Sequence, residues 1–229
     1  MGTRQLSLPL TSGWGGRRPG AGRKRANPSA RASTAHRDRG VHRRAEPMHV
    51  TLRRGRNLPS FRADLAFRVL TDAIGASQRG TFRITHFSVQ VDHIHLLVEA
   101  SDKATLSAGM RGLVIRMARR LNAALHRRGR VWADRWNGRA LSTPREVRNA
   151  LAYVLLNGRK HRAIPFGLDP CASVLWSADV FADPVYRTGL RLLASERAPS
   201  VAEPKTWLLQ TGWRRHGLLR LTDMPRLQR

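Results

Sequence analysis

The segment TFRITHFSVQVDHIHLLVEA, residues 81–100, predicts two adjacent antiparallel strands. It is rich in β-branched and aromatic residues, and its apolar side chains alternate with polar ones as in a half-buried strand. The alternation slips by one residue near His86, which indicates a β-bulge. The second run, 93–100, follows the first so closely that the two are expected to form a hairpin.

The second of these strands presents two chemically different faces, because side chains alternate along a strand. Ile94, Leu96, Val98 and Ala100 form an apolar face, and His93, His95, Leu97 and Glu99 form the other. The two histidines lie roughly 6.6 Å apart along the strand, so their rings can converge on one divalent ion. A histidine pair on a solvated sheet face is the structural alternative, and the pattern alone leaves both open.

The flanking segments extend the hairpin to an α+β order, β-α-β-β-α-β-α. The expected elements are a strand at 49–52, a helix over 61–74, a long helix capped by Ser101 or Asp102, a short strand or extended loop at 130–139, and a helix that begins at Thr143. This order fits a ferredoxin-like antiparallel sheet with helices on one face.

The helix after Thr143 carries a second candidate site. Thr143 and Glu146 form a capping box, and Gly158 is a plausible end of the helix. Tyr153 and Asn157 are four residues apart and therefore neighbours on one helix face. They are either a half-buried core tyrosine with a helix-ending asparagine, or a nucleophilic phenol with an amide oxygen for a metal.

The charge balance favours a polyanionic partner. Lys and Arg number 42 against 15 Asp and Glu, a formal net charge of +27. We find no apolar run near the ~18 residues of a membrane span and no signal-peptide pattern. The single cysteine, Cys171, excludes an internal disulfide and a cysteine-clustered zinc site. We therefore expect a soluble intracellular protein that works on nucleic acid.

Two motifs together resemble a known family. His93-Ile94-His95 resembles the His-hydrophobic-His motif of HUH single-strand nucleases, and Tyr153-Val154-Leu155-Leu156-Asn157 resembles the tyrosine helix of REP-associated tyrosine transposases, which are single-tyrosine HUH enzymes. The resemblance covers about residues 47–162 and includes the 132–139 stretch. Members usually place proline after the asparagine, whereas this chain has Gly158.

The resemblance implies an enzyme that nicks and transfers single-stranded DNA through a 5′-phosphotyrosine intermediate. Tyr153 would be the nucleophile, and His93, His95 and Asn157 would hold Mg²⁺ or Mn²⁺. Single-stranded, hairpin or palindromic DNA is the implied partner, and a homodimer stays open. The resemblance also implies a cytoplasmic, nucleoid-associated protein of prokaryotic type. Two alternatives remain: a non-catalytic basic nucleic-acid-binding protein, and a related HUH nicking enzyme of the relaxase or replication-initiator type.

The predicted organisation has three parts: a basic flexible arm (1–45), an HUH transposase-like catalytic domain (46–165) and a loop-rich extension of unknown role (166–229) with one or two short helices in 207–219. Several basic residues are candidates for phosphate contact: Arg23, Lys24, Arg25, Arg116, Arg120 and Arg135. Trp132 and Trp136 would either stack on bases or pack in the core.

Overall fold

The computed structural model describes residues 42–160, 169–195 and 199–223. One antiparallel sheet has the spatial order β2-β3-β1-β4, and the predicted α+β class is confirmed. The strands are β1 (Met48–Arg53), β2 (Phe82–Val89), β3 (His93–Ala100) and β4 (Asn137–Ala140). The helices are α1 (Asp64–Gly75), α2 (Lys103–Ala124), α3 (Pro144–Leu155), α4 (Asn157–Lys160), α5 (Pro184–Ser195) and α6 (Trp207–Gln210), with 3₁₀ turns at Ser173–Trp176, Ala178–Val180 and Gly212–His216.

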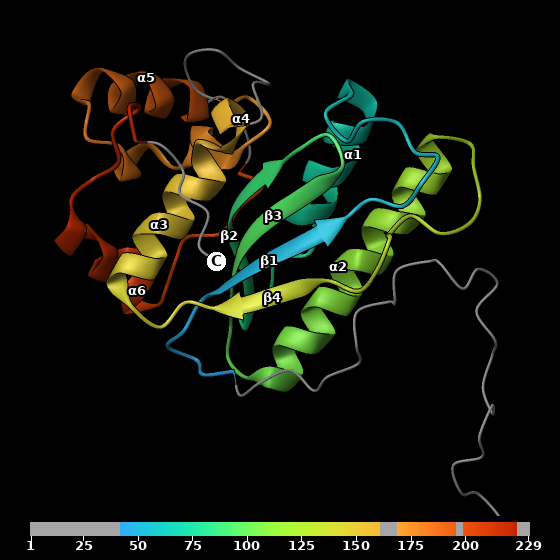
Figure 1. The fold of residues 1–229 in the computed structure, drawn as a ribbon, viewed down its shortest axis with the longest axis horizontal. Helices are drawn as coiled ribbons and strands as arrows, with labels where there is room; N and C mark the ends of the chain where they lie inside the picture. Colours follow the sequence, from blue (N-terminus) through green and yellow to red (C-terminus); the bar gives the residue numbers. More distant parts are fainter. Residues whose placement is uncertain (1–41, 161–168, 196–198, 224–229) are drawn as a thin grey trace, which may run out of the picture. The chain divides into compact units, whose positions relative to one another are not determined.

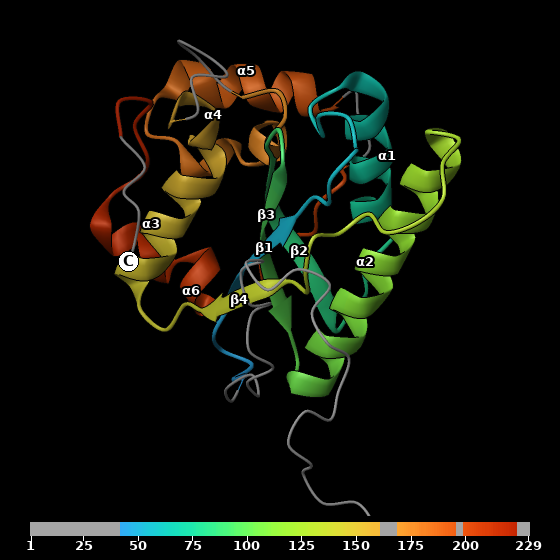
Figure 2. The same ribbon diagram turned by 45° about the vertical axis from the view of Figure 1, so that its right-hand side comes forward.

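Helices lie on both faces of the sheet (Figures 1 and 2). The sheet separates two hydrophobic cores. On one face, Ile94, Leu96 and Val98 of β3 pack with α1 and α2. On the other face, Leu97 packs with α3 and the C-terminal elements. The expectation of helices on one face therefore holds for α1 and α2, while α3 lies on the opposite face. Leu97 is the apolar anchor for α3 on a face that is otherwise polar along β3.

The predicted bulge in β2 is confirmed. The β2–β3 register shifts between Ile84 and His86, and the His86 side chain is buried. Because the Thr85 hydroxyl donates to the carbonyl oxygen of Leu97, it can accept a hydrogen bond from His86 Nδ1 at 3.1 Å. Burial lowers the pKa of His86 from 6.5 to about 4, and the nearby Glu99 opposes this shift.

His86 is expected to destabilise the protein in acid. The unfolded chain binds a proton at His86 below pH 6.5 and the folded chain only near pH 4, so unfolding free energy falls as the pH drops through this window. The loss is roughly 3 kcal/mol at 1.36 kcal/mol per pKa unit. The free energy of unfolding, measured with urea at pH 7 and at pH 4, should fall less between these pH values in His86→Gln than in the wild type. An equal fall in His86→Gln and in the wild type would show that His86 does not cause the acid destabilisation.

Capping residues act largely as their sequence indicates. The Asp102 side chain accepts from Thr105 N and begins α2, and Thr143 with Glu146 forms the predicted capping box at the start of α3. The end of α3 differs from the expectation, because the helix stops at Leu155 and Asn157 starts the short helix α4. Tyr153 and Asn157 therefore belong to different helices.

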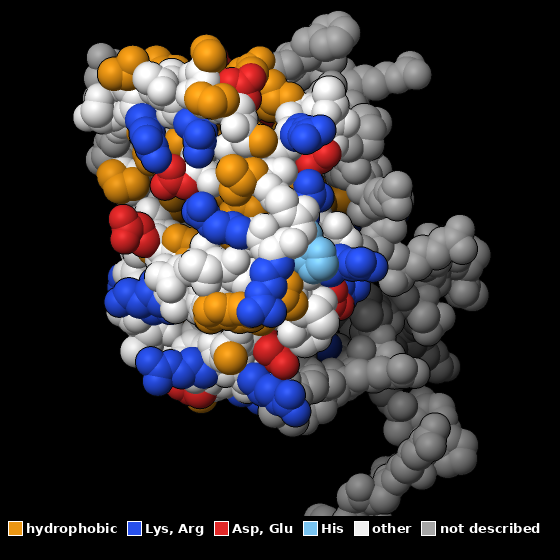
Figure 3. Space-filling view, turned by 90° about the vertical axis from the view of Figure 1, so that its left-hand side faces the viewer, with side chains coloured by type: hydrophobic (Ala, Val, Ile, Leu, Met, Phe, Trp, Pro, Cys, Tyr) orange, Lys and Arg blue, Asp and Glu red, His pale blue; other side chains and the backbone are white. Residues whose placement is uncertain are grey.

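The C-terminal segment is more ordered than its pattern indicates. Helix α6 and the 212–216 turn correspond to the short helices predicted for 207–219, but α5 was not predicted. Only Leu190 of α5 is buried, while Val185, Leu192 and Leu193 are exposed. Exposed hydrophobic side chains gather at the end of the molecule that carries α5 (Figure 3).

Two sequence predictions can be compared only in part with the structure. The predicted arm (1–45) lies almost entirely outside the described residues, which begin at residue 42. Within the described ranges, no helix is both long and apolar enough to cross a membrane.

Candidate active site

Strand register assembles the candidate site on the face of the sheet that α3 covers. His93 and His95 of β3 lie opposite Arg53 and Thr51 of β1. His49, two residues before Thr51 on the same strand face, lies opposite Arg139 of β4. Three adjacent strands thus contribute polar side chains to one surface patch.

Tyr153 of α3 completes a cluster of four rings, which we call the ring cluster: His49, His93, His95 and Tyr153. The His95 ring centroid is 4.6 Å from that of His93 and 4.9 Å from that of Tyr153. The His49 centroid is 5.2 Å from that of His95 and 5.7 Å from that of Tyr153. The structure therefore brings Tyr153, His93 and His95 together within one chain.

Protein groups orient the rings of both histidines in the His-Ile-His motif. His93 Nδ1 donates to Asp92 Oδ1 at 2.6 Å, and this hydrogen bond holds the pKa of Asp92 below its ordinary value. His95 Nδ1 lies 3.2 Å from both His49 Nε2 and Thr51 Oγ1. Nδ1 of each ring has a protein partner, the arrangement that commonly fixes histidines for metal binding through Nε2.

Burial keeps two members of the ring cluster uncharged near neutral pH. Desolvation, aided by the positive charge of Arg139, lowers the pKa of His49 to about 4. Desolvation raises the pKa of the half-buried Tyr153 phenol above its ordinary value of 10.0. The phenol therefore keeps its proton until an activating charge approaches.

Asn157 has the properties of an unused ligand. Its side chain is fully buried, and neither its amide oxygen nor its amide nitrogen has a hydrogen-bond partner among the described residues. Buried polar atoms normally have partners, so this amide calls for an explanation. In the described part of the chain, no three His, Cys, Asp or Glu side chains form a metal-binding group. An amide oxygen is a ligand type that hard divalent ions accept.

Gly158 follows Asn157 because a carboxylate fills the space of a side chain there. A Cβ at Gly158 would overlap the Asp169 carboxylate. Asp169 is itself fixed, because it accepts two hydrogen bonds from Arg62 and one from Cys171 N. This partly buried ion pair explains why the chain carries glycine after Asn157.

Substitution Gly158→Ala is expected to lower the free energy of unfolding by about 2–3 kcal/mol, the cost of overpacking a buried site. Gly112→Ala is the matched control, since a Cβ there meets nothing within 4 Å, and in a helix it should stabilise by up to ~1 kcal/mol. Urea titration of both variants measures the difference. Equal stability of the two variants would show that Asp169 moves away freely.

The basic residues proposed to bind DNA are dispersed. Arg116 and Arg120 belong to α2, on the sheet face away from the ring cluster (Figure 2), and Arg116 donates to Ser77 Oγ at 2.6 Å. Arg135 is exposed just before β4. Arg23, Lys24 and Arg25 lie outside the described residues. Basic side chains are spread over the face shown in Figure 3 rather than gathered in one patch.

The tertiary structure also settles the role of one tryptophan. Trp132 is buried against Phe61, with ring centroids 5.7 Å apart, and its Nε1 donates to Val114 O. It packs in the core, so the base-stacking alternative is wrong for Trp132.

Sequence reasoning missed His49 and Thr51 as members of the site. The signal was present in the alternation His49-Val50-Thr51-Leu52, which puts both polar residues on one strand face. The information that this face adjoins His95 comes only from the β1–β3 pairing.

The antiparallel sheet presents a His-hydrophobic-His pair to a tyrosine on a packed helix, the arrangement implied by the resemblance to single-tyrosine transposases. Residues 47–154 match the family described as "Transposase IS200 like". The match spans a little under half of the chain, and over these residues the chain is similar to the IS200-like transposases.

A solved structure supports the fold. The chain is similar to a protein described as "Structure of the REP associates tyrosine transposase bound to a REP hairpin", with 17% identity and a TM-score of 0.50. The alignment covers 76% of this chain and 93% of that chain. No curated protein matches the sequence.

Proposed function

We propose that the protein cleaves and rejoins single-stranded DNA with Tyr153 as nucleophile, in a reaction that depends on a divalent metal ion. The observation that carries the proposal is the 4.9 Å separation of the Tyr153 and His95 ring centroids within one chain. Hairpin DNA is the proposed substrate, in line with the REP hairpin bound by the structurally similar transposase.

The donor set fits Mg²⁺ or Mn²⁺. His93 and His95 would bind through Nε2, and the buried amide oxygen of Asn157 would supply a hard oxygen ligand. A divalent ion there would stabilise, as a Lewis acid, the negative charge that develops on the non-bridging phosphate oxygens.

The residues of the chain define the covalent step. Tyr153 Oη attacks the scissile phosphorus, an Oη–P bond forms and the P–O3′ bond breaks. The phenol loses its proton as it attacks, and the departing 3′ oxygen gains one. In the reverse direction a 3′-OH attacks the phosphotyrosine and releases Tyr153. Because the bond energy is conserved in the tyrosine ester, rejoining needs no external energy source.

Two arginines at the ring cluster are suited to hold the DNA backbone. Arg53 is exposed opposite His93, and Arg139 lies opposite His49. Guanidinium groups bind phosphate oxygens through paired hydrogen bonds. We propose that these arginines position the scissile phosphate over Tyr153.

The test uses one hairpin oligonucleotide with a single-stranded flank, labelled at either end and incubated with the protein and Mn²⁺. A 5′-phosphotyrosine intermediate transfers the 3′ label to the protein and leaves the 5′ label on a shortened strand. Both results are expected after denaturing electrophoresis. Shortened strands without any protein-linked label would indicate a water-based nuclease and contradict the proposal.

A further inference from the structure

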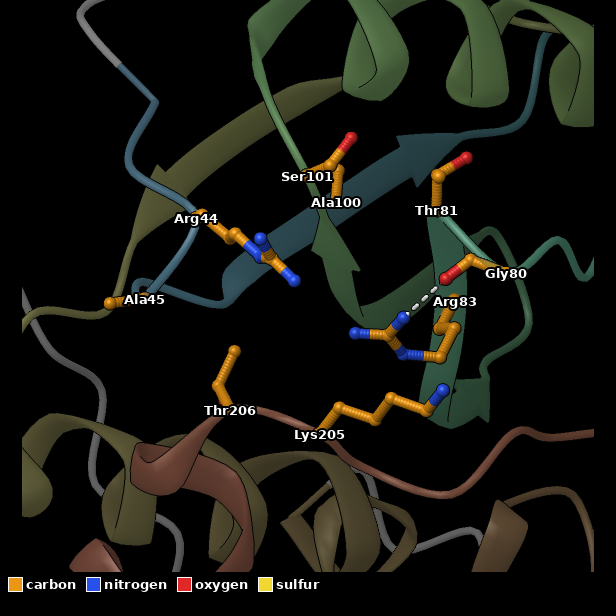
Figure 4. Close-up of a pocket in the computed structure, with 9 residues that line it drawn as sticks. All are labelled: Arg44, Ala45, Gly80, Thr81, Arg83, Ala100, Ser101, Lys205 and Thr206. Atoms are coloured by element: carbon orange, nitrogen blue, oxygen red, sulfur yellow. Dashed lines mark hydrogen bonds between the residues drawn. The ribbon is translucent and has the colours of Figure 1, made fainter.

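A basic cavity of about 390 Å³ lies at the opposite end of β3 from His93 (Figure 4). Arg44 reaches it from the segment before β1, Arg83 from β2, and Lys205 from the segment before α6. Gly80, Thr81, Ser101 and Thr206 contribute further lining. We propose that this cavity is a second DNA-binding site, which holds a backbone phosphate of the substrate away from the phosphate that is cleaved.

A buried carboxylate organises the cavity. Glu99 is 1% exposed and accepts hydrogen bonds from Arg83 Nε and Nη2 at 3.0 and 2.8 Å. The same carboxylate accepts from the backbone N–H groups of Lys205 and Thr206 and from the Thr206 hydroxyl. Glu99 thereby joins β2 to the C-terminal segment, and the positions of the Arg83 guanidinium and of the Lys205 backbone are set before a ligand arrives.

The cavity has donors and positive charge for an anion. The described hydrogen bonds of Arg83 use three of its five N–H groups, two with Glu99 and one with the carbonyl oxygen of Gly80. Glu99 offsets the charge of Arg83, whereas Arg44 and Lys205 add two positive charges. None of the described residues that line the cavity is acidic. Figure 4 shows the Arg44 and Arg83 guanidinium groups facing a common space, an arrangement that a phosphate would stabilise.

The cavity and the ring cluster share one face of the sheet. Glu99 lies four residues from His95 and six from His93, so all three side chains project to the same side of β3. Arg83 lies directly opposite Glu99 on β2. Five residues of strand separate His95 from Ala100 at the cavity, a distance of about 17 Å. This span equals roughly five base-pair rises of duplex DNA, so a hairpin stem is long enough to reach both sites.

This inference rests on the proposed function in one respect, that the ligand is DNA. It assigns a binding role to Lys205 in the C-terminal segment, which lies beyond the residues that match the transposase family. It separates a site that anchors the substrate from the ring cluster that reacts with it.

The test compares Arg44→Ala/Lys205→Ala with the matched control Arg68→Ala/Arg128→Ala, which removes the same charge from exposed residues of α1 and of the loop after α2. Affinity for a fluorescent DNA hairpin is measured from 50 to 200 mM salt. Loss of the contact to this one phosphate should lower the magnitude of the slope of log K against log salt by roughly 1. Each lost charge-assisted hydrogen bond should weaken binding roughly tenfold. The control should retain the wild-type slope.

Adduct formation on a short single strand without a stem separates this inference from the proposed function. Because a short strand without a stem does not reach the cavity, Arg44→Ala/Lys205→Ala should form this adduct at the wild-type rate. If wild type forms no adduct, the proposed function fails, while the salt slopes still decide the role of the cavity. Equal salt slopes for Arg44→Ala/Lys205→Ala and for the control would overturn the inference. The inference would also be overturned if Arg44→Ala/Lys205→Ala lost as much adduct formation on the short strand as it loses on the hairpin. Titration with inorganic phosphate tests whether the cavity binds a free anion instead of DNA. If phosphate binds and Arg44→Ala/Lys205→Ala leaves hairpin affinity unchanged, the cavity is a site for a free anion and the inference is wrong.

Discussion

Tyr153→Phe is expected to abolish the covalent protein–DNA adduct, with a fall in rate on the order of 10³-fold or more. Phenylalanine keeps the ring that contacts His95 and His49 and removes only the hydroxyl that would attack phosphorus. Hairpin affinity and unfolding free energy should therefore change little. The measurement is the rate of transfer of a 3′ label to the protein in Mn²⁺.

The chain provides an exact control for this substitution. It contains two tyrosines, and the other, Tyr186, lies on α5 with 37% of its surface exposed. Tyr186→Phe should form the adduct at the wild-type rate. Adduct formation by Tyr153→Phe at the wild-type rate, or its loss in Tyr186→Phe instead, would remove Tyr153 from the mechanism.

His95→Gln is expected to have the second largest effect, a loss of roughly 10²- to 10³-fold in the rate of Mn²⁺-dependent adduct formation, somewhat beyond the 10–100-fold typical of residues that only support metal ligands. Glutamine approximates the volume of histidine in a site that is 4% exposed, so the fold should persist. Mn²⁺ affinity, measured by calorimetry, should fall together with the rate, and hairpin affinity without metal should not.

His216 serves as the reference for His95, because it is an exposed histidine in the C-terminal segment. His216→Gln should retain both Mn²⁺ affinity and rate. If His95→Gln binds Mn²⁺ as tightly as His216→Gln does, the histidine pair is structural and the metal lies elsewhere.

Mixing the two inactive variants tests whether the site is complete within one chain. Tyr153 contacts His95 of its own chain in this structure, so Tyr153→Phe mixed with His95→Gln should remain inactive. Recovery of adduct formation in the mixture would mean that the tyrosine of one chain serves the histidines of another. A homodimer would then be required for activity.

Local patterns were sufficient for much of the fold. The β2–β3 hairpin, its bulge, the two faces of β3 and the capping box of α3 all follow from side chains within a few residues of each other. Helix α5 was not predicted, although Tyr186, Leu190 and Leu193 recur at helical spacing. Of these three side chains only Leu190 is buried, so most of the stripe is not packed against the core.

The sequence by itself determined the candidates for the chemistry: the histidine pair on one strand face, the tyrosine on a capped helix and an unbalanced positive charge. Only the tertiary structure decided that α3 covers the histidine face, that His49 and Thr51 contact His95, and that Asp169 requires glycine beside Asn157. The physical reason is that strand pairing and helix packing join residues far apart in the chain. A periodic pattern records which side of an element is polar, but it contains no information about which other element that side will meet.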